Sequence, residues 1–341
     1  MNLLLSDEQT QIVDTLKHFL TENAPVARFR PPAPQLGNRD YALWSQLAEL
    51  GFLGVSIPEN LGGIGLGGAE EMVACREFGR HLVSPSILAI MLSARIAAAV
   101  GNKVLLHELL SGKTHVGLAN PLVNVELDEA CHGDFHLIEC GDASLILCCT
   151  PDGAALFRRT DFSAIEPVSA MDHSLSLERA RLNGVNPVAR VSSATDPLYA
   201  RALVLIGAYA VGMAEATRDM AVDYAKLREQ FGKPIGSFQA IKHICADMAI
   251  RAEAALCQTA FASLMLTEDQ ASVDFHSIAC KLVSIDAALK NAGQNIQVHG
   301  AIGFTSEADA HLYVKRSHVM DQLWGDMRVQ HARMVCVPFA G

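Results

Sequence analysis

The chain has 341 residues, of which 50% are hydrophobic, and its formal net charge is -10 at neutral pH. This composition predicts a globular protein with a large buried core and argues against an intrinsically disordered chain. The acidic balance gives no general electrostatic footprint for nucleic acid or for an anionic membrane surface, so we expect neither as a partner.

The cysteines, histidines and apolar runs further limit the classes of protein to consider. Nine cysteines occur without a Cys-x-x-Cys pair, which favours buried thiols in a reducing compartment, and we expect a cytoplasmic protein. The N-terminus lacks the pattern of a signal peptide, and the most apolar run, residues 87–101, is short and contains Arg95, so we expect no membrane span. The thirteen histidines show no metal-ligand spacing, so we expect no metal site.

The first third of the chain has the pattern of a helical domain. Ser6 and Gln9 have the spacing of a capping box ahead of an apolar helical run, and residues 41–53 show a second helical repeat of apolar residues. Two turn-rich segments separate the helical patterns, a Pro-rich link at residues 28–40 and a Gly-rich loop at residues 57–68.

The middle of the chain changes to short apolar runs bounded by Gly, Asp and Pro. These runs are residues 135–140, 144–150 and 154–160. Their length and boundaries are typical of strands, so we expect a small β domain here.

The last third has long apolar stripes with alternating spacings of three and four residues. Such stripes predict long helices packed in a bundle, and their usual role is to form the core. A fourth helix is predicted from about Ser306 to Trp324, and Gly300 fits a helix C-terminal cap. The three stripes are Leu203, Ile206, Ala210, Met213, Thr217, Met220, Tyr224 and Leu227; Ile241, Cys245, Met248, Ala252 and Ala255; and Phe275, Ile278, Leu282, Ile285, Leu289, Ala292 and Ile296.

Three segments resemble signatures of the acyl-CoA dehydrogenase family, in the family's order and with similar spacing. They are LAELGFLGVSIPENLGGIGLG (47–67), REQFGKPIGSFQAI (228–241) and QVHGAIGFTSEADAHLYVKR (297–316). The resemblance spans the whole chain and agrees with the apolar patterns. It implies an α+β multidomain fold with an N-terminal helical domain (1–112), a shortened middle β domain (113–194) and a C-terminal four-helix bundle (195–341).

The second and third segments imply a role in binding FAD. In this family they reach across a subunit interface to the adenine and pyrophosphate part of the flavin that the neighbouring subunit holds. A guanidinium suits a pyrophosphate because it offers several charge-assisted donors in a fixed fork, and small residues let the backbone approach a ligand closely. From the residues alone, the alternative is that Arg228 is a solvated charge at a helix end and that Gly300 is a simple helix cap. The matching positions are Arg228, Phe231, Gln239, Gln297, Val298, His299, Gly300 and Ala301.

The family's chemistry also requires a carboxylate base, and this sequence lacks one at the expected positions. The base removes the α-proton of an acyl-CoA thioester while the flavin accepts a hydride from the β-carbon. Counting from Phe304 places the usual base position at Trp324, and a second family position falls at Ala202. The loop that supports the flavin ring in the family is replaced here by Ala-Asn-Pro at 119–121.

The sequence therefore keeps the residues with which a family subunit contacts its neighbour's flavin. It lacks the base and the flavin-ring loop that a subunit needs to use a flavin of its own. The resemblance is to the non-catalytic subunit of bacterial sterol side-chain acyl-CoA dehydrogenases, which are heterotetramers of two related chains. It implies a homologous acyl-CoA dehydrogenase chain as partner, an acyl-CoA substrate bound through the partner's site, FAD shared across the interface, and an electron-transfer flavoprotein or equivalent acceptor.

Two alternatives stay open. The first is a self-sufficient homomeric enzyme with a relocated base, for which Asp326, Asp321 and Glu307 are the candidates. Asp326 takes the family position two residues after the base, although a surface or capping role is commoner for such a carboxylate. The second alternative is a structural homologue that binds no flavin.

Overall fold

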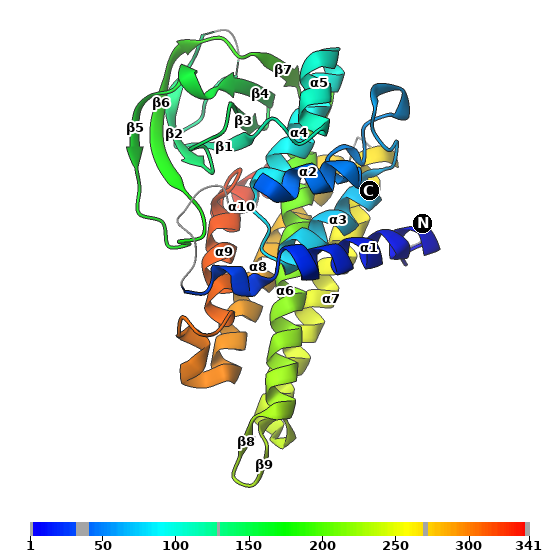
Figure 1. The fold of residues 1–341 in the computed structure, drawn as a ribbon, viewed down its shortest axis with the longest axis vertical. Coiled ribbons are helices and arrows are strands. Elements are labelled where there is room, and N and C mark those ends of the chain that lie inside the picture. Colours follow the sequence, from blue (N-terminus) through cyan, green and yellow to red (C-terminus); the bar gives the residue numbers. More distant parts are fainter. Residues whose placement is uncertain (1–2, 32–40, 128–129, 269–271, 338–341) are drawn as a thin grey trace.

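Helices and strands follow one another in three blocks along the chain (Figure 1). The computed structural model describes residues 3–31, 41–127, 130–268 and 272–337. A helical block comes first, a β-sheet second and a helical block third, which confirms the predicted fold class. The helices of the first block are α1 (Asp7–Asn23), α2 (Tyr41–Glu49), α3 (Gly68–Arg80), α4 (Ser86–Ala99) and α5 (Lys103–Leu110).

The capping box at the start of the first helix is confirmed. The backbone N–H of Gln9 donates to the Ser6 hydroxyl, and the backbone N–H of Ser6 donates to the Gln9 side chain, each at 3.1 Å. Helix α2 ends earlier than the apolar repeat predicts, because Gly51 has a left-handed φ of 81° and a 3-10 turn follows it. Most of the Pro-rich link, residues 32–40, lies outside the described residues.

The middle block is a seven-stranded sheet. The order across it is β5-β6-β2-β1-β3-β4-β7, and only the β1–β3 pair is parallel. The three predicted apolar runs are confirmed as strands β2, β3 and β4. The strands are β1 (Val116–Pro121), β2 (Cys131–Ile138), β3 (Leu145–Thr150), β4 (Gly153–Arg158), β5 (Ser163–Pro167), β6 (Leu177–Val185) and β7 (Ala189–Ser192).

Strand β3 is buried on both faces, which explains the adjacent cysteines. Leu147 and Cys149 face the main core shared with the helices, whereas Ile146 and Cys148 face a second core on the other side of the sheet. Because successive side chains of a strand point to opposite faces, the two thiols cannot pair. Both thiols are free, and burial raises the pKa of each, as the prediction of buried thiols requires. The prediction is wrong for Cys257 and Cys336, which are exposed, and Cys245 is only partly buried.

The third block confirms the three long helices and divides the fourth. Helices α6 (Leu198–Leu227), α7 (Gln239–Glu268) and α8 (Val273–His299) match the apolar stripes, and Gly300 is the C-cap residue of α8. The predicted helix 306–324 is α9 (Ala310–Gln322), and a separate helix α10 (Met327–Cys336) follows it. The break falls where Trp324 and Gly325 take positive φ values of 55° and 92°.

Helix α6 is the longest apolar element. By length and composition it is the single helix among the described residues that meets the criteria for crossing a membrane, and its apolar window is entirely buried inside the structure. Figure 1 shows it running from the sheet to a hairpin at the opposite end of the molecule. The hairpin consists of β8 (Glu229–Gln230) and β9 (Lys233–Pro234).

Arg316, on α9, joins the three blocks through a buried hydrogen-bond network. Its Nε donates to Asp172 Oδ2 at 2.6 Å, in the loop between β5 and β6, and its Nη1 donates to the Tyr209 hydroxyl of α6 at 2.7 Å. Nη1 also donates to the carbonyl oxygens of Leu82 and Val83, between α3 and α4, at 3.0 and 3.1 Å. Burial alone would raise the pKa of Asp172, but the Arg316 charge and the hydrogen bonds to the carboxylate hold it below its ordinary value.

Replacing Arg316 with Met should therefore destabilise the protein strongly. The change leaves the buried Asp172 carboxylate without its charged partner and removes one donor from each of two carbonyls, which should lower the free energy of unfolding by about 3–5 kcal/mol in urea. The matched control is Arg181→Met, because Arg181 pairs with Asp134 at 2.8 Å but is 58% exposed, and we expect a much smaller change. Equal losses in the two variants would contradict this account.

The Arg316–Asp172 pair should also make the stability of the protein sensitive to acid. The pKa of Asp172 is lower in the folded protein than in the unfolded chain, so its contribution is present at neutral pH. It should be lost as the pH falls below about 4 and through the folded pKa. Unfolding free energies measured at neutral and acidic pH should show this loss in the parent protein and a smaller one in Arg316→Met.

Candidate functional site

A cavity of about 780 Å³ lies between the sheet, the first turn of α6 and the turn that joins α9 to α10. Its volume is in the range of small-molecule and cofactor sites. The cavity brings together two segments that the sequence analysis singled out, residues 119–121 through Asn120 and Pro121, and the base position through Trp324. Thr150, Tyr199, Asp326 and Arg333 are also among its lining residues.

The backbone of Trp324 is fixed by three side chains, two of them from distant parts of the chain. Its N–H donates to Asn120 Oδ1 at 2.9 Å, so the two positions that depart from the family pattern are bonded to each other. Its carbonyl oxygen accepts from the Tyr199 hydroxyl at 2.5 Å and from Gln330 Nε2 at 2.8 Å. The turn is therefore held rigidly at the wall of the cavity.

Two buried polar atoms of the lining residues have no hydrogen-bond partner among the residues that the structure describes. They are the Thr150 hydroxyl and the Trp324 indole N–H, and the two residues are only 6% and 2% exposed. Buried donors normally have partners, so unpartnered ones at a cavity are a place where a ligand's acceptor atoms would be satisfied. On this observation the cavity is a candidate site for a polar ligand.

The candidate carboxylates have structural roles. Asp326 is the N-cap of α10 and accepts from the Val329 N–H at 2.8 Å, while Asp321 accepts from the Met327 N–H at 3.0 Å. Of the three candidates, Asp326 alone lines the cavity, and Glu307 is exposed beyond α8. Ala202, the second family base position, is fully buried in the core of α6.

Arg228, Phe231 and Gln239 lie together around the hairpin at the far end of α6. Arg228 is the C-cap residue of α6 and is exposed, with no side-chain hydrogen bond or ion pair to the described residues. Phe231 is 93% exposed and has a left-handed φ of 52°. Gln239 is the exposed first residue of α7.

The remaining predicted cofactor residues surround the end of α8. The His299 ring stacks on Tyr224 of α6 at 4.2 Å between ring centroids, which places this segment beside the hairpin end of α6. Val298 is buried in the apolar cluster that joins these helix ends, whereas Gln297 and Ala301 are exposed. Gly300 combines φ 67° with ψ -146°, a conformation open almost only to glycine, so the backbone alone requires glycine here.

The cavity, with positions 119–121 and 324, is therefore far from the predicted cofactor residues at the hairpin end of α6. Tyr199 is in the first turn of α6 and lines the cavity, and Arg228 is at the other end of the same 30-residue helix. A helix of this length measures roughly 45 Å. Figure 1 shows this separation between the sheet and the hairpin.

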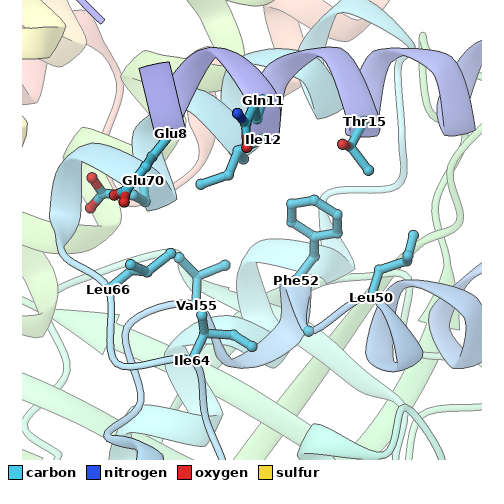
Figure 2. Close-up of a pocket in the computed structure, with 11 residues that line it drawn as sticks. Glu8, Gln11, Ile12, Thr15, Leu50, Phe52, Val55, Ile64, Leu66 and Glu70 are labelled. Atoms are coloured by element: carbon cyan, nitrogen blue, oxygen red, sulfur yellow. The ribbon is translucent and has the colours of Figure 1, made fainter. Parts of the chain in front are cut away.

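A second cavity of about 460 Å³ lies beneath α1 (Figure 2). One face of α1 forms its roof, and the first family-like segment forms its floor through Phe52, Val55 and Ile64. Glu70 at its edge already accepts hydrogen bonds from Gln9 Nε2 and the Gly67 N–H, both at 2.8 Å. Within the described ranges, no group of three His, Cys, Asp or Glu side chains converges as a metal site.

Sequence reasoning missed several residues that shape the larger cavity. Tyr199 carries no local signal, because its partner Trp324 is 125 residues away, and no functional motif of the sequence analysis includes Thr150 or Gln330. Lys281 was recognisable in principle, since it lies three residues after Ile278 and four before Ile285, on the buried stripe of α8. A lysine at such a position is rarely buried without a specific partner.

Comparison with known proteins identifies the fold class first. The structure resembles butyryl-CoA dehydrogenase from Megasphaera elsdenii (TM-score 0.83, 20% identity, 98% of this chain and 99% of that one). It also resembles the ChsE4-ChsE5 complex from Mycobacterium tuberculosis (TM-score 0.83, 20% identity, 98% of each chain). A third similar structure is the Tcur3481-Tcur3483 steroid ACAD (TM-score 0.81, 23% identity, 97% of each chain).

Sequence relatives and family models then identify the family. Residues 6–111 match the acyl-CoA dehydrogenase N-terminal domain and residues 199–335 match the acyl-CoA dehydrogenase C-terminal domain. Acyl-CoA dehydrogenase IpdE2 of M. tuberculosis is 32% identical over 320 residues, which cover 93% of each chain. Acyl-CoA dehydrogenase FadE34 of M. tuberculosis is 36% identical over 290 residues, covering 83% of this chain and 40% of that relative. The chain belongs to the acyl-CoA dehydrogenase family.

The capping role of Asp326 can be tested with two substitutions. Asp326→Ala removes the acceptor for the Val329 N–H and should lower the free energy of unfolding by about 1 kcal/mol. Asp326→Asn keeps an equally good cap and should change it by only a few tenths. If Asn destabilises as much as Ala in denaturant unfolding, the carboxylate charge, not the cap, is what the fold needs.

Proposed function

We propose that this chain is the non-catalytic subunit of a FAD-dependent acyl-CoA dehydrogenase and completes the flavin site of a homologous partner chain. The reaction is the α,β-desaturation of an acyl-CoA thioester. FAD supplies the hydride acceptor when bound. The contribution of this chain is to bind and orient the cofactor from across the interface.

The separation of the two predicted half-sites carries this proposal. Arg228 and the cavity-lining Tyr199 lie at opposite ends of α6, and roughly 45 Å exceeds the length of a single FAD. One cofactor therefore cannot reach both ends of the same chain. If the exposed end around Arg228 contacts a flavin, that flavin is held by another subunit.

The chemistry of the exposed end suits a pyrophosphate group. Arg228 offers a guanidinium that has no side-chain partner in the described part of the chain, and Gln239 and Gln297 add exposed polar side chains at neighbouring helix ends. Leu227 and Phe231 are 81% and 93% exposed, so the same end also presents apolar surface of the kind that protein interfaces cover.

The cavity of this chain has no carboxylate at position 324, the usual place of the family's base. Position 324 holds a tryptophan whose backbone is bonded to Asn120, so the two departures from the family pattern form one local structure. No carboxylate takes the base's place on this turn except Asp326, which caps α10. These residues can enclose a ligand and exclude water, but they offer no base at position 324.

The similar proteins supply the suggestion of a partner and a substrate class. Two of the similar structures are titled as pairs of chains, ChsE4-ChsE5 and Tcur3481-Tcur3483, and the latter is a steroid ACAD. We extend to this chain a homologous partner in a heterotetramer, a steroid side-chain CoA thioester as substrate class, and an electron-transfer flavoprotein or equivalent as electron acceptor. A cytoplasmic location is part of the same proposal.

A self-sufficient homomeric enzyme is the second candidate, because Asp326 lines the cavity. Asp326→Asn is the suitable test, since it keeps the cap of α10 and removes the base. The remaining alternative, a homologue that binds no flavin, is an outcome of the experiments below.

Expressed alone, the chain should contain little or no FAD and should not oxidise acyl-CoA thioesters. The loss of activity follows from the absence of a carboxylate at positions 324 and 202. The loss of FAD follows from the replacement of the family's flavin-ring loop by Ala-Asn-Pro at 119–121 and from the missing contacts of a second chain. Flavin absorbance per chain and turnover with an artificial electron acceptor measure this directly. Stoichiometric flavin with turnover that disappears in Asp326→Asn would establish the self-sufficient enzyme instead.

In the complex with its homologous partner, Arg228→Ala should weaken FAD retention. Loss of a charge-assisted contact to pyrophosphate should cost roughly 1.5–3 kcal/mol, or about tenfold or more in affinity. Arg228→Lys should recover only part of this, because a point charge does not reproduce the fork of the guanidinium.

The matched control is Lys226→Ala, which removes an exposed cation from the same helix end. FAD dissociation should be compared only in complexes of unchanged size. Equal FAD affinity in Arg228→Ala and the parent complex would show that Arg228 is only a solvated charge at a helix end. A colourless parent complex would indicate the flavin-free homologue.

A further inference from the structure

The turn between α9 and α10 is held by a lysine that has no exposure to solvent. Lys281 lies on α8, and its Nζ donates hydrogen bonds to the carbonyl oxygens of Leu323 and Gly325. These carbonyls flank Trp324, so one ammonium group holds the turn on both sides of the residue at the cavity wall. Hydrogen bonds from a charged donor are about twice as strong as those between neutral groups.

The backbone of this turn needs such support. Trp324 has a left-handed φ of 55°, which is unfavourable for a bulky residue and persists only where surrounding contacts determine it. Asn120, Tyr199 and Gln330 hold the N–H and carbonyl of Trp324 itself. Lys281 supplies the two remaining carbonyl contacts, and it supplies them from the core.

The charge of Lys281 is finely balanced. Burial lowers its pKa to about 7, the nearby carboxylates of Asp321 and Asp326 raise it, and Arg333 lowers it. These groups come from the end of α9, the cap of α10 and α10 itself, and Tyr199 faces the turn from α6 with a hydroxyl whose pKa is raised chiefly by burial. Near neutral pH, Lys281 therefore changes between a charged and a neutral donor.

We propose that Lys281 is a positioning residue whose ammonium form holds the Leu323–Gly325 turn and keeps the Trp324 indole at the cavity wall, and that the turn loosens when Lys281 becomes neutral. The inference concerns the shape of the cavity in this chain, and it stands independently of the role proposed for Arg228. It predicts that the wall at position 324 is firm at mildly acidic pH and looser at mildly alkaline pH.

The test is fluorine NMR of the full chain labelled with fluorotryptophan. The sequence contains two tryptophans, Trp324 and Trp44, and Trp44 is buried in the N-terminal block as an internal reference. We expect the Trp324 resonance to move in one step with a midpoint about pH 7, while the Trp44 resonance stays still. The step should be absent from Lys281→Met, which keeps the length of the side chain without its charge.

His136 is the matched control, because it is a second titratable group that lines the cavity, and burial lowers its pKa from the ordinary value. His136→Gln should keep the step of the Trp324 resonance. A step that persists in Lys281→Met, that disappears in His136→Gln, or that is missing from the parent protein would overturn the proposal. The titration of the parent protein keeps the proposal testable if Lys281→Met does not fold.

Discussion

The buried guanidinium of Arg316 is the interaction on which the arrangement of the three blocks depends. One side chain on α9 bonds to the sheet through Asp172, to α6 through Tyr209, and to the chain between α3 and α4 through two carbonyls. Because Arg316, Asp172 and Tyr209 are buried, loss of the guanidinium would leave hydrogen bonds in the network that water cannot readily replace. The relative placement of sheet and helices, and with it the cavity between them, follows from this constraint.

The length of α6 then separates the cavity from the exposed residues that are predicted to contact a cofactor. Its first turn lines the cavity through Tyr199, and its last residue precedes the exposed Arg228. A helix is rigid over this distance, so the two ends cannot serve one ligand in one chain. The geometry of a single helix thus makes a neighbouring subunit part of the proposed function, independently of how the turn at Trp324 is held.

Local features of the fold could be predicted from the sequence, and long-range contacts could not. The capping box at Ser6 and the apolar stripes of α6 to α8 depend on residues a few positions apart, so their periodicity identifies them. The break between α9 and α10 depends on the positive φ of Trp324, which a bulky residue adopts only because Asn120 and Lys281 hold the turn. Those contacts span 204 and 42 residues, and no local pattern encodes them.

The same distinction applies to the candidate site. The sequence pointed to positions 119–121 and 324 as departures from a family pattern, and the structure shows that they meet in one hydrogen bond. It also pointed to Arg228 and Gly300, whose roles toward a cofactor stay predictions because a single chain leaves both exposed. Residues that contact a neighbouring subunit are expected to be exposed in the isolated chain.

The most direct test of the central claim is the number of flavins in the purified complex of this chain with its homologous partner. The account predicts one FAD for each pair of unlike chains, because the partner holds the flavin and this chain completes its site. Two FAD molecules per pair, or a fully flavin-loaded homomer of this chain, would contradict it.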